Sequence, residues 1–476
     1  MTRQEVAWAP VGALAAALTA VLLAVAGRYG YHRDELYFLE AGRHPAFGYV
    51  DQPPFTPLVA RAATELFDGS LVGLRLLPAL AAGLTVLVTA LIARELGAGR
   101  GAQLFAAACV AAAAYPLAVG HLLSTSTFDL LAWTVICWLV LRALRTQRLG
   151  SWLLVGLAAG LGLQNKALVA FLLGALLAGL LLAGPREVLR RPGPWLAGLV
   201  ALVLWLPFLV WQAAHGWPML ALSAAIAGGS SGSSEPRWLF LPFQLVLVGV
   251  FLAPVWIVGL WRLWRDPRLR AFAVAYAVLA LVFLVTGGKP YYLAGLYPLL
   301  LAAGAEPVLR RIRGWRAGIA VAATAFGSAL VMLPIVPAAE LAQTPIPGIY
   351  GEAGEQVGWP ELAATVATVH ATVPDAVVLT RNYGEAGAID RFGPGPAYSG
   401  HNAYADWRVP PESATTAVVV GYDEQQLRRW FGTVERAAVI DNGVGLGNDE
   451  QGTPVWVARD RLAPWALLWP QVRHIS

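Results

Sequence analysis

The sequence predicts an α-helical protein that crosses a membrane many times and ends in a small extracytoplasmic α/β domain. Of its 476 residues, 57% are apolar and 13% are charged, whereas a soluble globular protein carries about 25% charged residues. This composition excludes a purely soluble enzyme, a disordered chain and a disulfide-rich secreted module. The two cysteines, Cys109 and Cys137, lie inside apolar runs, so we interpret them as small apolar side chains.

Apolar runs recur from the N-terminus to Pro337, and about 20 such residues in a helix cross the hydrocarbon core of a bilayer. We therefore predict a transmembrane domain at residues 1–337 with about eleven helices, three of them short. No cleavage pattern follows the first run, which we interpret as a signal anchor. The predicted spans are 8–27, 73–93, 102–118, 128–145, 151–164, 167–184, 195–213, 239–260, 271–286, 291–305 and 317–337.

The distribution of arginine predicts the orientation. Five loops on one side hold 16 Arg, whereas the short loops on the other side hold only Lys166, Arg237 and Lys289. Cytoplasmic loops carry the excess of Lys and Arg, so we predict a cytoplasmic N-terminus and an extracytoplasmic C-terminus in the inner membrane of a bacterium. The loops rich in arginine are 94–101, 142–150, 185–194, 261–270 and 306–316.

Residues 338–476 are the predicted α/β domain. From Glu340 onward the chain holds 9 Arg and 16 acidic residues, a net charge of −7, which leaves +12 for the rest of a chain whose total is +5. Short β-type runs with helical stretches between them are typical of a small α/β domain, and this charge pattern does not fit nucleic-acid binding. The β-type runs are Ala376–Leu379, Ala417–Val420, Ala437–Ile440 and Pro454–Val457, and the helical stretches include Glu361–His370 and Asp423–Phe431.

The first extracytoplasmic loop, 28–72, holds six acidic residues. Neighbours on a helix point about 100° apart, so one of the adjacent Asp34 and Glu35 can face a cavity while the other has a different role. A solvated cluster of charges at the interface is the alternative. Asp51–Pro54 (DQPP) is a stiff bend, and Thr56–Phe67 has one apolar face, which predicts an amphipathic helix at the membrane surface.

Only two of the 34 basic residues are lysines, Lys166 and Lys289, and both fall at predicted outer ends of spans. A lysine ammonium is a compact point charge suited to a phosphate. The alternative is that both side chains simply reach up to the lipid headgroups. Lys289 is followed by Pro290, Tyr291 and Tyr292 in a second stiff turn, whose aromatic rings suit an interface or the face of a sugar.

Asp129 begins an apolar run in the segment His121–Leu130 (HLLSTSTFDL). A carboxylate near the hydrocarbon is expensive and usually faces a polar cavity, and here His121 and four hydroxyl residues accompany it. The alternative is a helix N-cap or a surface acid just outside the membrane. Gly228–Ser234 (GGSSGSS) predicts a flexible outer loop that acts as a gate or a linker.

The sequence contains no metal-binding spacing, no P-loop, no nucleophile elbow and no dinucleotide fingerprint. We therefore predict no metal site and no required cofactor, although a divalent metal stays open as an alternative. Arg381–Asp390 (RNYGEAGAID) follows a β-type run and is a weak signal of a ligand-binding loop, with a purely structural loop as the alternative.

Four segments together resemble the GT-C class of membrane glycosyltransferases, and within it glycosyltransferase family 39, with the protein O-mannosyltransferases and the bacterial lipid A aminoarabinose transferases. They are His32–Tyr37 (HRDELY), Gly48–Pro54 (GYVDQPP), Leu163–Lys166 (LQNK) and Lys289–Tyr292 (KPYY), in this order. The resemblance covers roughly residues 1–310. It implies transfer of a sugar from a polyprenyl-phosphate donor, with inversion, on the outer face of the membrane, to an acceptor that is a glycan, a lipid or a protein.

The resemblance also implies roles for single residues. Asp34 would be the general base, with Glu35 beside it, and Asp51 would belong to the second motif of the outer loop. Lys166 and Lys289 would face the donor phosphate, in a pocket that also brings in Asp34. We predict that the donor-binding residues are His32, Arg33, Asp51, His121, Asp129, Lys166, Lys289, Tyr291 and Tyr292. A transporter or flippase for lipid-linked sugars, and a membrane scaffold without activity, are the alternatives.

Overall fold

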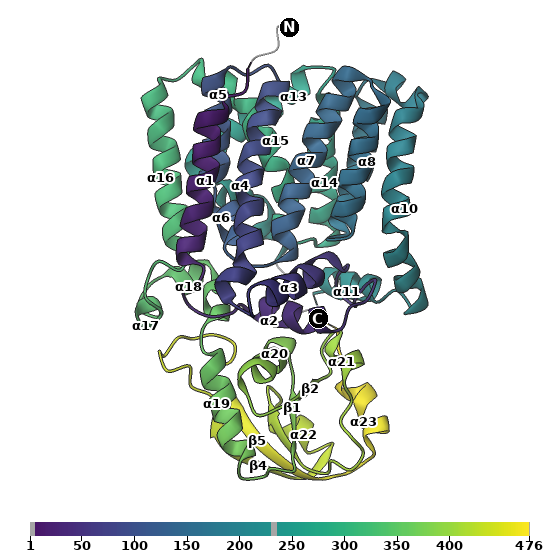
Figure 1. Ribbon diagram of the computed structural model, residues 1–476, viewed down its shortest axis with the longest axis vertical. Helices are drawn as coiled ribbons and strands as arrows, with labels where there is room; N and C mark the ends of the chain where they lie inside the picture. The colour runs from purple at the N-terminus through teal and green to yellow at the C-terminus, as the bar shows by residue number, and fades with distance from the viewer. Residues whose placement is uncertain (1–4, 230–235, 476) are drawn as a thin grey trace. The chain divides into compact units, whose positions relative to one another are not determined.

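A computed structural model describes residues 5–229 and 236–475 of the chain (Figure 1). The chain divides into two compact units. The helical unit comprises Met1–Ala26, Gln52–Thr56 and Arg75–Leu333, and the mixed unit comprises Gly27–Asp51, Pro57–Leu74 and Pro334–Ser476. The first loop, which the sequence analysis grouped with the transmembrane helices, is thus folded largely with the C-terminal residues. The predicted loop Gly228–Ser234 falls mostly at residues 230–235, outside the described part.

Each of the eleven predicted spans corresponds to a helix or to a bent pair of helices. Among the described residues, six helices are long and apolar enough to cross a membrane, and eight spans result when each bent pair counts as one. The chain is a multi-pass membrane protein. The helices are α1 (Trp8–Val25), α4 (Leu71–Glu95), α5 (Arg100–Ala112), α6 (Ala114–Gly120), α7 (Thr125–Thr146), α8 (Leu149–Leu163), α9 (Leu168–Leu182), α10 (Pro192–Ala214), α11 (Pro218–Ala227), α12 (Phe240–Val248), α13 (Ala253–Arg265), α14 (Arg270–Thr286), α15 (Tyr297–Leu309) and α16 (Gly314–Met332).

Two of the spans are sharply bent. The α5–α6 pair bends by 60°, and the segment formed by a short 3₁₀ turn (Arg237–Leu239) and α12 bends by 83° against the following segment that contains α13. Gly249 makes the second bend, because its φ of +97° is one that other residues rarely adopt, and a Cβ there would lie 2.5 Å from Thr324 Cγ2. Bends of this size place a backbone turn at a position where an unbent helix would continue across the helical unit.

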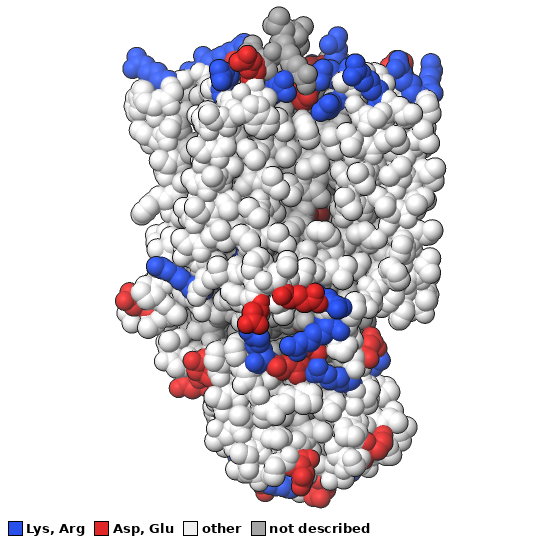
Figure 2. Space-filling model, viewed as in Figure 1, with Lys and Arg blue, Asp and Glu red and all other residues white. Residues whose placement is uncertain are grey.

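Most arginines of the helical unit gather at one end. Figure 2 shows Lys and Arg along the rim where α1 and α5 begin and α4 ends, and below it a broad belt whose surface is almost entirely uncharged. This is the arrangement that the five arginine-rich loops predict, and the belt suits the hydrocarbon of a bilayer.

The mixed unit contains a five-stranded sheet in the order β2-β1-β3-β5-β4. β1 pairs in parallel with β2 and β3, and β5 pairs antiparallel with β3 and β4, so the predicted small α/β domain is confirmed. The strands are β1 (Val377–Thr380), β2 (Ala397–Ser399), β3 (Ala417–Val420), β4 (Phe431–Val439) and β5 (Pro454–Arg461). The helices are α2 (Arg33–Arg43), most of α3 (Phe55–Leu66), α17 (Ala338–Leu341), α18 (Ile346–Ile349), α19 (Trp359–His370), α20 (Tyr383–Phe392), α21 (Tyr404–Trp407), α22 (Glu424–Leu427) and α23 (Trp465–Val472).

Two details of the predicted secondary structure are wrong. The stretch Asp423–Phe431, which is predicted to be helical, contains only the short α22. Phe431 instead begins β4, and its side chain packs into the core of the sheet, where it is 1% exposed. The strand β2 (Ala397–Ser399) was not predicted, since three residues with a serine among them carry too little of a β pattern.

Close packing joins α2 to α20 within the mixed unit. Gly387 of α20 allows it, because a Cβ there would lie 2.7 Å from Leu36 Cβ and 3.1 Å from the Leu36 backbone. The first loop and the C-terminal residues therefore form one packed structure. The predicted amphipathic helix is confirmed as α3, in which Leu58 and Leu66 are 46% and 75% exposed.

Candidate active site

The paired acids of the first loop have different surroundings at the start of α2. Glu35 is fully buried and accepts a hydrogen bond from the His32 backbone N–H at 2.9 Å, while His32 Nδ1 accepts one from the Asp34 N–H at 3.2 Å. This reciprocal capping box satisfies two donors at the helix start. Glu35 thus stabilises the start of α2. The carboxylate of the half-buried Asp34 takes no part in this cap and is the candidate catalytic group of the pair.

Asp34 is held by a side chain from the far end of the chain. Tyr383 Oη donates a hydrogen bond of 2.8 Å to Asp34 Oδ1. The Tyr383 ring stacks on Tyr37 and on His401, with centroids 4.7 and 4.6 Å away, and the Arg33 guanidinium lies 5.4 Å from its centroid. Burial and the neighbouring Asp34 carboxylate raise the pKa of Tyr383 well above its ordinary value, so the phenol remains a donor.

Asp51 belongs to the same cluster. It accepts hydrogen bonds from Tyr37 Oη at 2.8 Å and from Asn402 Nδ2 at 3.5 Å. Burial raises the pKa of Asp51 to about 6, and the Asp34 carboxylate adds to this shift. The structure therefore links Asp34 and Asp51 through the stacked rings of Tyr37 and Tyr383 in one hydrogen-bonded network.

The two basic residues before Asp34, His32 and Arg33, contact acidic side chains of the mixed unit. His32 Nε2 lies 2.8 Å from Glu352 Oε2, and because Nδ1 is an acceptor, the ring proton belongs on Nε2 and is donated to Glu352. Arg33 donates to Glu355 at 3.1 Å and to Asp449 at 3.5 Å. Both predicted donor-binding residues thus hold the start of α2 against the C-terminal part of the chain.

A second cluster lies in the helical unit, where the two lysines meet. Lys166 Nζ donates a hydrogen bond of 2.9 Å to Ser126 Oγ and lies 5.3 and 5.8 Å from the ring centroids of Tyr291 and Tyr292. Lys289 Nζ lies 5.9 Å from the same Tyr291 ring. Cations within about 6 Å of an aromatic face are attracted to it, so Tyr291 gathers both lysines at one place.

Asp129 is part of this second cluster. It is 6% exposed, interacts electrostatically with Lys166, and its Oδ1 makes no hydrogen bond to any described residue. Ser124, not Asp129, caps α7, so the interpretation of Asp129 as an N-cap is wrong. A buried carboxylate beside a lysine, with an oxygen still unpartnered, is the arrangement expected of a polar ligand site.

His121 has a different environment from the lysines. It is 1% exposed and follows α6, where its Nδ1 lies 3.1 Å from the carbonyl oxygen of Leu117, one turn earlier. This contact satisfies one of the last carbonyls of the helix.

Several site residues were missed by sequence reasoning. In the helical unit, Asn165 accepts from Thr56 Oγ1 at 2.8 Å and donates to the Thr125 carbonyl at 2.7 Å, which fixes the turn that carries Lys166. In the mixed unit, Tyr383 and Asn402 hold the two aspartates. The signal for Tyr383 was its place in the Arg381–Asp390 segment, which contains the turn after β1 and most of α20. Among the described residues, no group of three His, Cys, Asp or Glu side chains has the arrangement of a metal site.

Comparisons with known proteins agree with this architecture. Residues 51–211 match the family model described as dolichyl-phosphate-mannose-protein mannosyltransferase. Undecaprenyl phosphate-alpha-4-amino-4-deoxy-L-arabinose arabinosyl transferase 1 of Pseudomonas fluorescens is 26% identical over 304 residues, 58% of this chain and 52% of that protein. The transferase of the same description from Pseudomonas paraeruginosa is 30% identical over 56% of this chain and 51% of its own length. The chain spans about half the length of these curated relatives.

Solved structures share the fold over a longer stretch. ArnT from Cupriavidus metallidurans bound to undecaprenyl phosphate superposes with a TM-score of 0.64, covering 94% of this chain and 97% of that one at 17% identity. The oligosaccharyltransferase of Archaeoglobus fulgidus gives a TM-score of 0.54 over 82% of this chain and 64% of that one, at 14% identity. The chain has the GT-C membrane fold and is similar in sequence to glycosyltransferase family 39.

Proposed function

We propose that this protein is an integral membrane glycosyltransferase that moves a sugar from a polyprenyl-phosphate donor to an extracytoplasmic acceptor, with inversion at the anomeric carbon. The observation that carries the proposal is that Lys166 and Lys289, at the turns that end two spans, lie 5.3 and 5.9 Å from the centroid of the same tyrosine ring, Tyr291. These are the only two lysines of the chain, and they give this cluster, which also contains the buried Asp129, an excess of positive charge.

The lysine cluster supplies what the leaving group needs. When the sugar departs from a lipid phosphate, the bond between the anomeric carbon and the phosphate oxygen breaks, and the phosphate keeps the electron pair. Preorganised positive charge stabilises this developing charge most where water is scarce. Lys166 is already oriented by Ser126, and the Tyr291 and Tyr292 rings offer an aromatic face to the sugar.

Asp34 supplies the base on the acceptor side. Its Oδ1 accepts from Tyr383, and its Oδ2 makes no hydrogen bond to a described residue. Such an oxygen can take the proton of an acceptor hydroxyl as that hydroxyl attacks the anomeric carbon. We propose that Asp34 and the two lysines act on the same donor molecule, that no metal is required, and that the reaction takes place on the outer side of the bacterial inner membrane.

The relatives support this choice of donor. The curated relatives are named as undecaprenyl phosphate-dependent aminoarabinose transferases. Two structures with the same fold hold the matching lipids, ArnT with undecaprenyl phosphate and the Archaeoglobus fulgidus oligosaccharyltransferase AglB with dolichol-phosphate. Polyprenyl phosphate is thus the ligand class that the fold and the lysine cluster favour together.

The proposal is tested with purified full-length protein in proteoliposomes that contain a panel of undecaprenyl-phosphate sugars and a cell-envelope extract as the source of acceptor. We expect release of undecaprenyl phosphate and labelling of an acceptor with one of the sugars, and loss of both with Asp34→Asn. Movement of the intact donor across the bilayer without cleavage of the sugar–phosphate bond would instead identify a flippase. Full turnover by Asp34→Asn would remove Asp34 from the role of base.

A further inference from the structure

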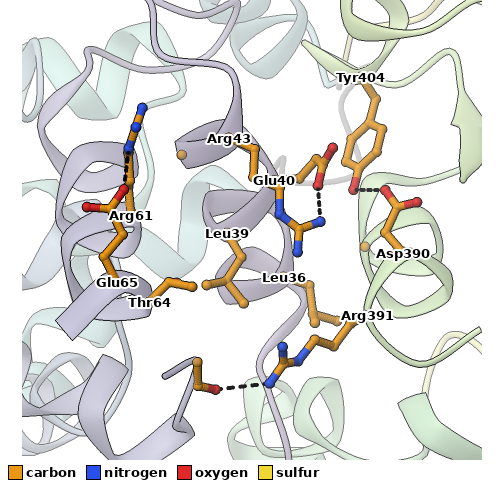
Figure 3. Close-up of a pocket in the computed structure, with 13 residues that line it drawn as sticks. Leu36, Leu39, Glu40, Arg43, Arg61, Thr64, Glu65, Asp390, Arg391 and Tyr404 are labelled. Carbon is orange, nitrogen blue, oxygen red and sulfur yellow. Dashed lines mark hydrogen bonds and ion pairs between the residues drawn. The ribbon is translucent and has the colours of Figure 1, made fainter. Parts of the chain in front are cut away.

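A cavity of about 320 Å³ lies in the mixed unit between α2, α3 and α20 (Figure 3). From α2 it is lined by Leu36, Leu39, Glu40 and Arg43, which recur at the spacing of one helix face. Asp34 does not line it. The cavity is therefore a separate place from the carboxylate cluster, on another face of the same helix.

Two buried carboxylates and a shared arginine form the framework of one wall. Glu40 is 2% exposed and accepts hydrogen bonds from Arg43 at 2.9 Å and from Arg408. Asp390 accepts from Arg408 at 2.8 Å and from Tyr404 Oη at 3.2 Å. Because these groups hold one another, the wall is stiff and the two carboxylates are neutralised by protein.

The positive charge of Arg391, on another wall of the cavity, is not neutralised by a carboxylate in the described part of the chain. Its guanidinium donates to the carbonyl oxygen of Gly69 at 3.0 Å and to Tyr31 Oη at 3.3 Å, and it lies 5.5 Å from the centroid of the Tyr31 ring. Both acceptors are neutral, and no carboxylate among the described residues lies within ion-pair distance. Figure 3 shows the Arg391 side chain beside the cavity, with its hydrogen bond drawn as a dashed line.

The formal net charge of the side chains around the cavity is therefore +1. Four arginines, Arg43, Arg61, Arg391 and Arg408, surround it or its wall, against the three acids Glu40, Glu65 and Asp390. Arg61 and Glu65 pair with each other at 2.8 Å on the exposed rim. The unpaired charge is thus the one on Arg391, and a guanidinium binds a carboxylate or phosphate through parallel hydrogen bonds.

The volume and the lining of the cavity indicate the size and the polarity of the rest of the ligand. Small-molecule sites begin at about 300 Å³, so this cavity suits one sugar ring with a substituent. The Thr64 hydroxyl and the exposed Arg43 guanidinium offer an acceptor and donors to sugar hydroxyls, and Leu36 and Leu39 offer an apolar surface to the ring face.

Resting on the proposed glycosyltransferase function, we propose that this cavity binds a part of the acceptor that does not react, a saccharide unit with one negatively charged group. Asp34 does not line the cavity, and Glu40 lies six residues after Asp34 on α2, about 9 Å along the helix axis, so a sugar held at the Glu40 wall binds away from the proposed base. Binding of a remote part of a substrate contributes to the orientation of the reacting part.

The test measures binding by the full-length protein without any donor lipid, with glucose 6-phosphate as the probe and with glucose and inorganic phosphate as the two partial probes. We expect glucose 6-phosphate to bind at least tenfold more tightly than either partial probe. Arg391→Gln should weaken this binding at least tenfold, and Thr64→Phe, which keeps Arg391 and fills the cavity, should do the same.

Arg459→Gln is the matched control, because Arg459 pairs with Glu435 on the exposed side of the sheet and should leave binding unchanged. Equal affinity for glucose 6-phosphate and for inorganic phosphate would overturn the proposal, and so would equal affinity of the Arg391→Gln and Arg459→Gln variants. Since no donor is present, failure of sugar transfer would leave this result intact, and absence of probe binding would leave the proposed function intact.

Discussion

Tyr383 donates a hydrogen bond of 2.8 Å to Asp34 across a separation of 349 residues. The tyrosine ring stacks on both Tyr37 and His401, and these contacts restrict the movement of its hydroxyl. One oxygen of the proposed base is therefore immobilised, and the direction of the other is set. The C-terminal part of the chain, which a comparison of the membrane helices alone would leave out, thus positions the group proposed to begin the reaction.

Removal of this hydroxyl should slow the chemical step more than it weakens binding of the donor. A hydrogen bond to a charged group contributes about 1.5–3 kcal/mol, so we expect Tyr383→Phe to lower kcat roughly 10- to 100-fold, with the donor KM changed by less than about threefold. Steady-state kinetics with the active donor from the panel measure both values.

Tyr29→Phe is the control for this change, because Tyr29 Oη also donates to an acceptor within the mixed unit, the Val336 carbonyl at 2.8 Å. Its kcat should match that of the wild type. Equal losses in the two variants would mean that Tyr383 acts only through the stability of the mixed unit.

The lysine cluster should govern use of the donor. Lys166→Ala and Lys289→Ala should each lower kcat/KM for the donor about 10- to 100-fold, because each removes a charge-assisted contact to the phosphate. Lys166→Arg, which keeps the charge, should restore part of the loss. Measurements at varied donor and fixed acceptor concentration separate this effect from acceptor binding. Wild-type donor kinetics in both alanine variants would show that the phosphate binds elsewhere.

Much of the membrane architecture could be predicted from the sequence, because hydropathy alone marks a helix that lies in lipid. Each predicted span has a matching helix, and the loops with arginine lie together at one end. Bends such as that at Gly249 could not be predicted, since they depend on how closely Thr324 of another helix approaches. An apolar run indicates that a segment lies in lipid, whereas packing against neighbouring helices determines whether that segment is straight or bent.

The candidate site was predictable in part, for a different reason. Asp34, Lys166 and Lys289 stand out in the sequence, because each is a rare charge beside an apolar run. Tyr383 and Asn402 do not stand out, since tyrosine and asparagine are ordinary residues in an α/β domain, and their roles arise only when α20 and the segment after β2 pack against α2. Sequence pattern thus identifies the charges, and tertiary packing selects the residues that orient them.

A buried acid should make the stability of the mixed unit depend on pH. Burial, followed by the carboxylates of Glu355 and Glu385, raises the pKa of Glu450 to about 8 from its ordinary 4.5. The folded state therefore holds this proton more tightly than the unfolded state does. The resulting stability is fully present below pH 4.5 and is lost as the pH rises through 8.

Glu450→Gln removes this titration and should raise the melting temperature at pH 8.5 by about 3 °C or more, with a much smaller effect at pH 5. Thermal unfolding followed by tryptophan fluorescence measures the difference. Glu435→Gln, at an exposed acid paired with Arg459, should show no such dependence on pH. A gain of the same size at both pH values would mean that burial of the Glu450 charge is not the cause.

Chelation should leave the reaction rate unchanged. We propose that Lys166 and Lys289 provide the positive charge for the leaving phosphate, a task that a divalent cation performs in other transferases. Turnover after dialysis against EDTA should therefore stay within about twofold of the untreated rate. A larger loss that returns with added Mg²⁺ or Mn²⁺ would show that the lysines need a metal partner.

The orientation can be tested with introduced cysteines, because the native Cys109 and Cys137 are both fully buried. Ser413 of the mixed unit and Arg268 of an arginine-rich loop are both exposed. With the C-terminal part outside, a maleimide that cannot cross membranes should label Ser413→Cys in intact spheroplasts and Arg268→Cys only after the membrane is permeabilised. The reverse order would place the arginine-rich loops outside, against the excess of arginine expected on the cytoplasmic side, and would put Asp34 on the wrong side for an extracytoplasmic acceptor.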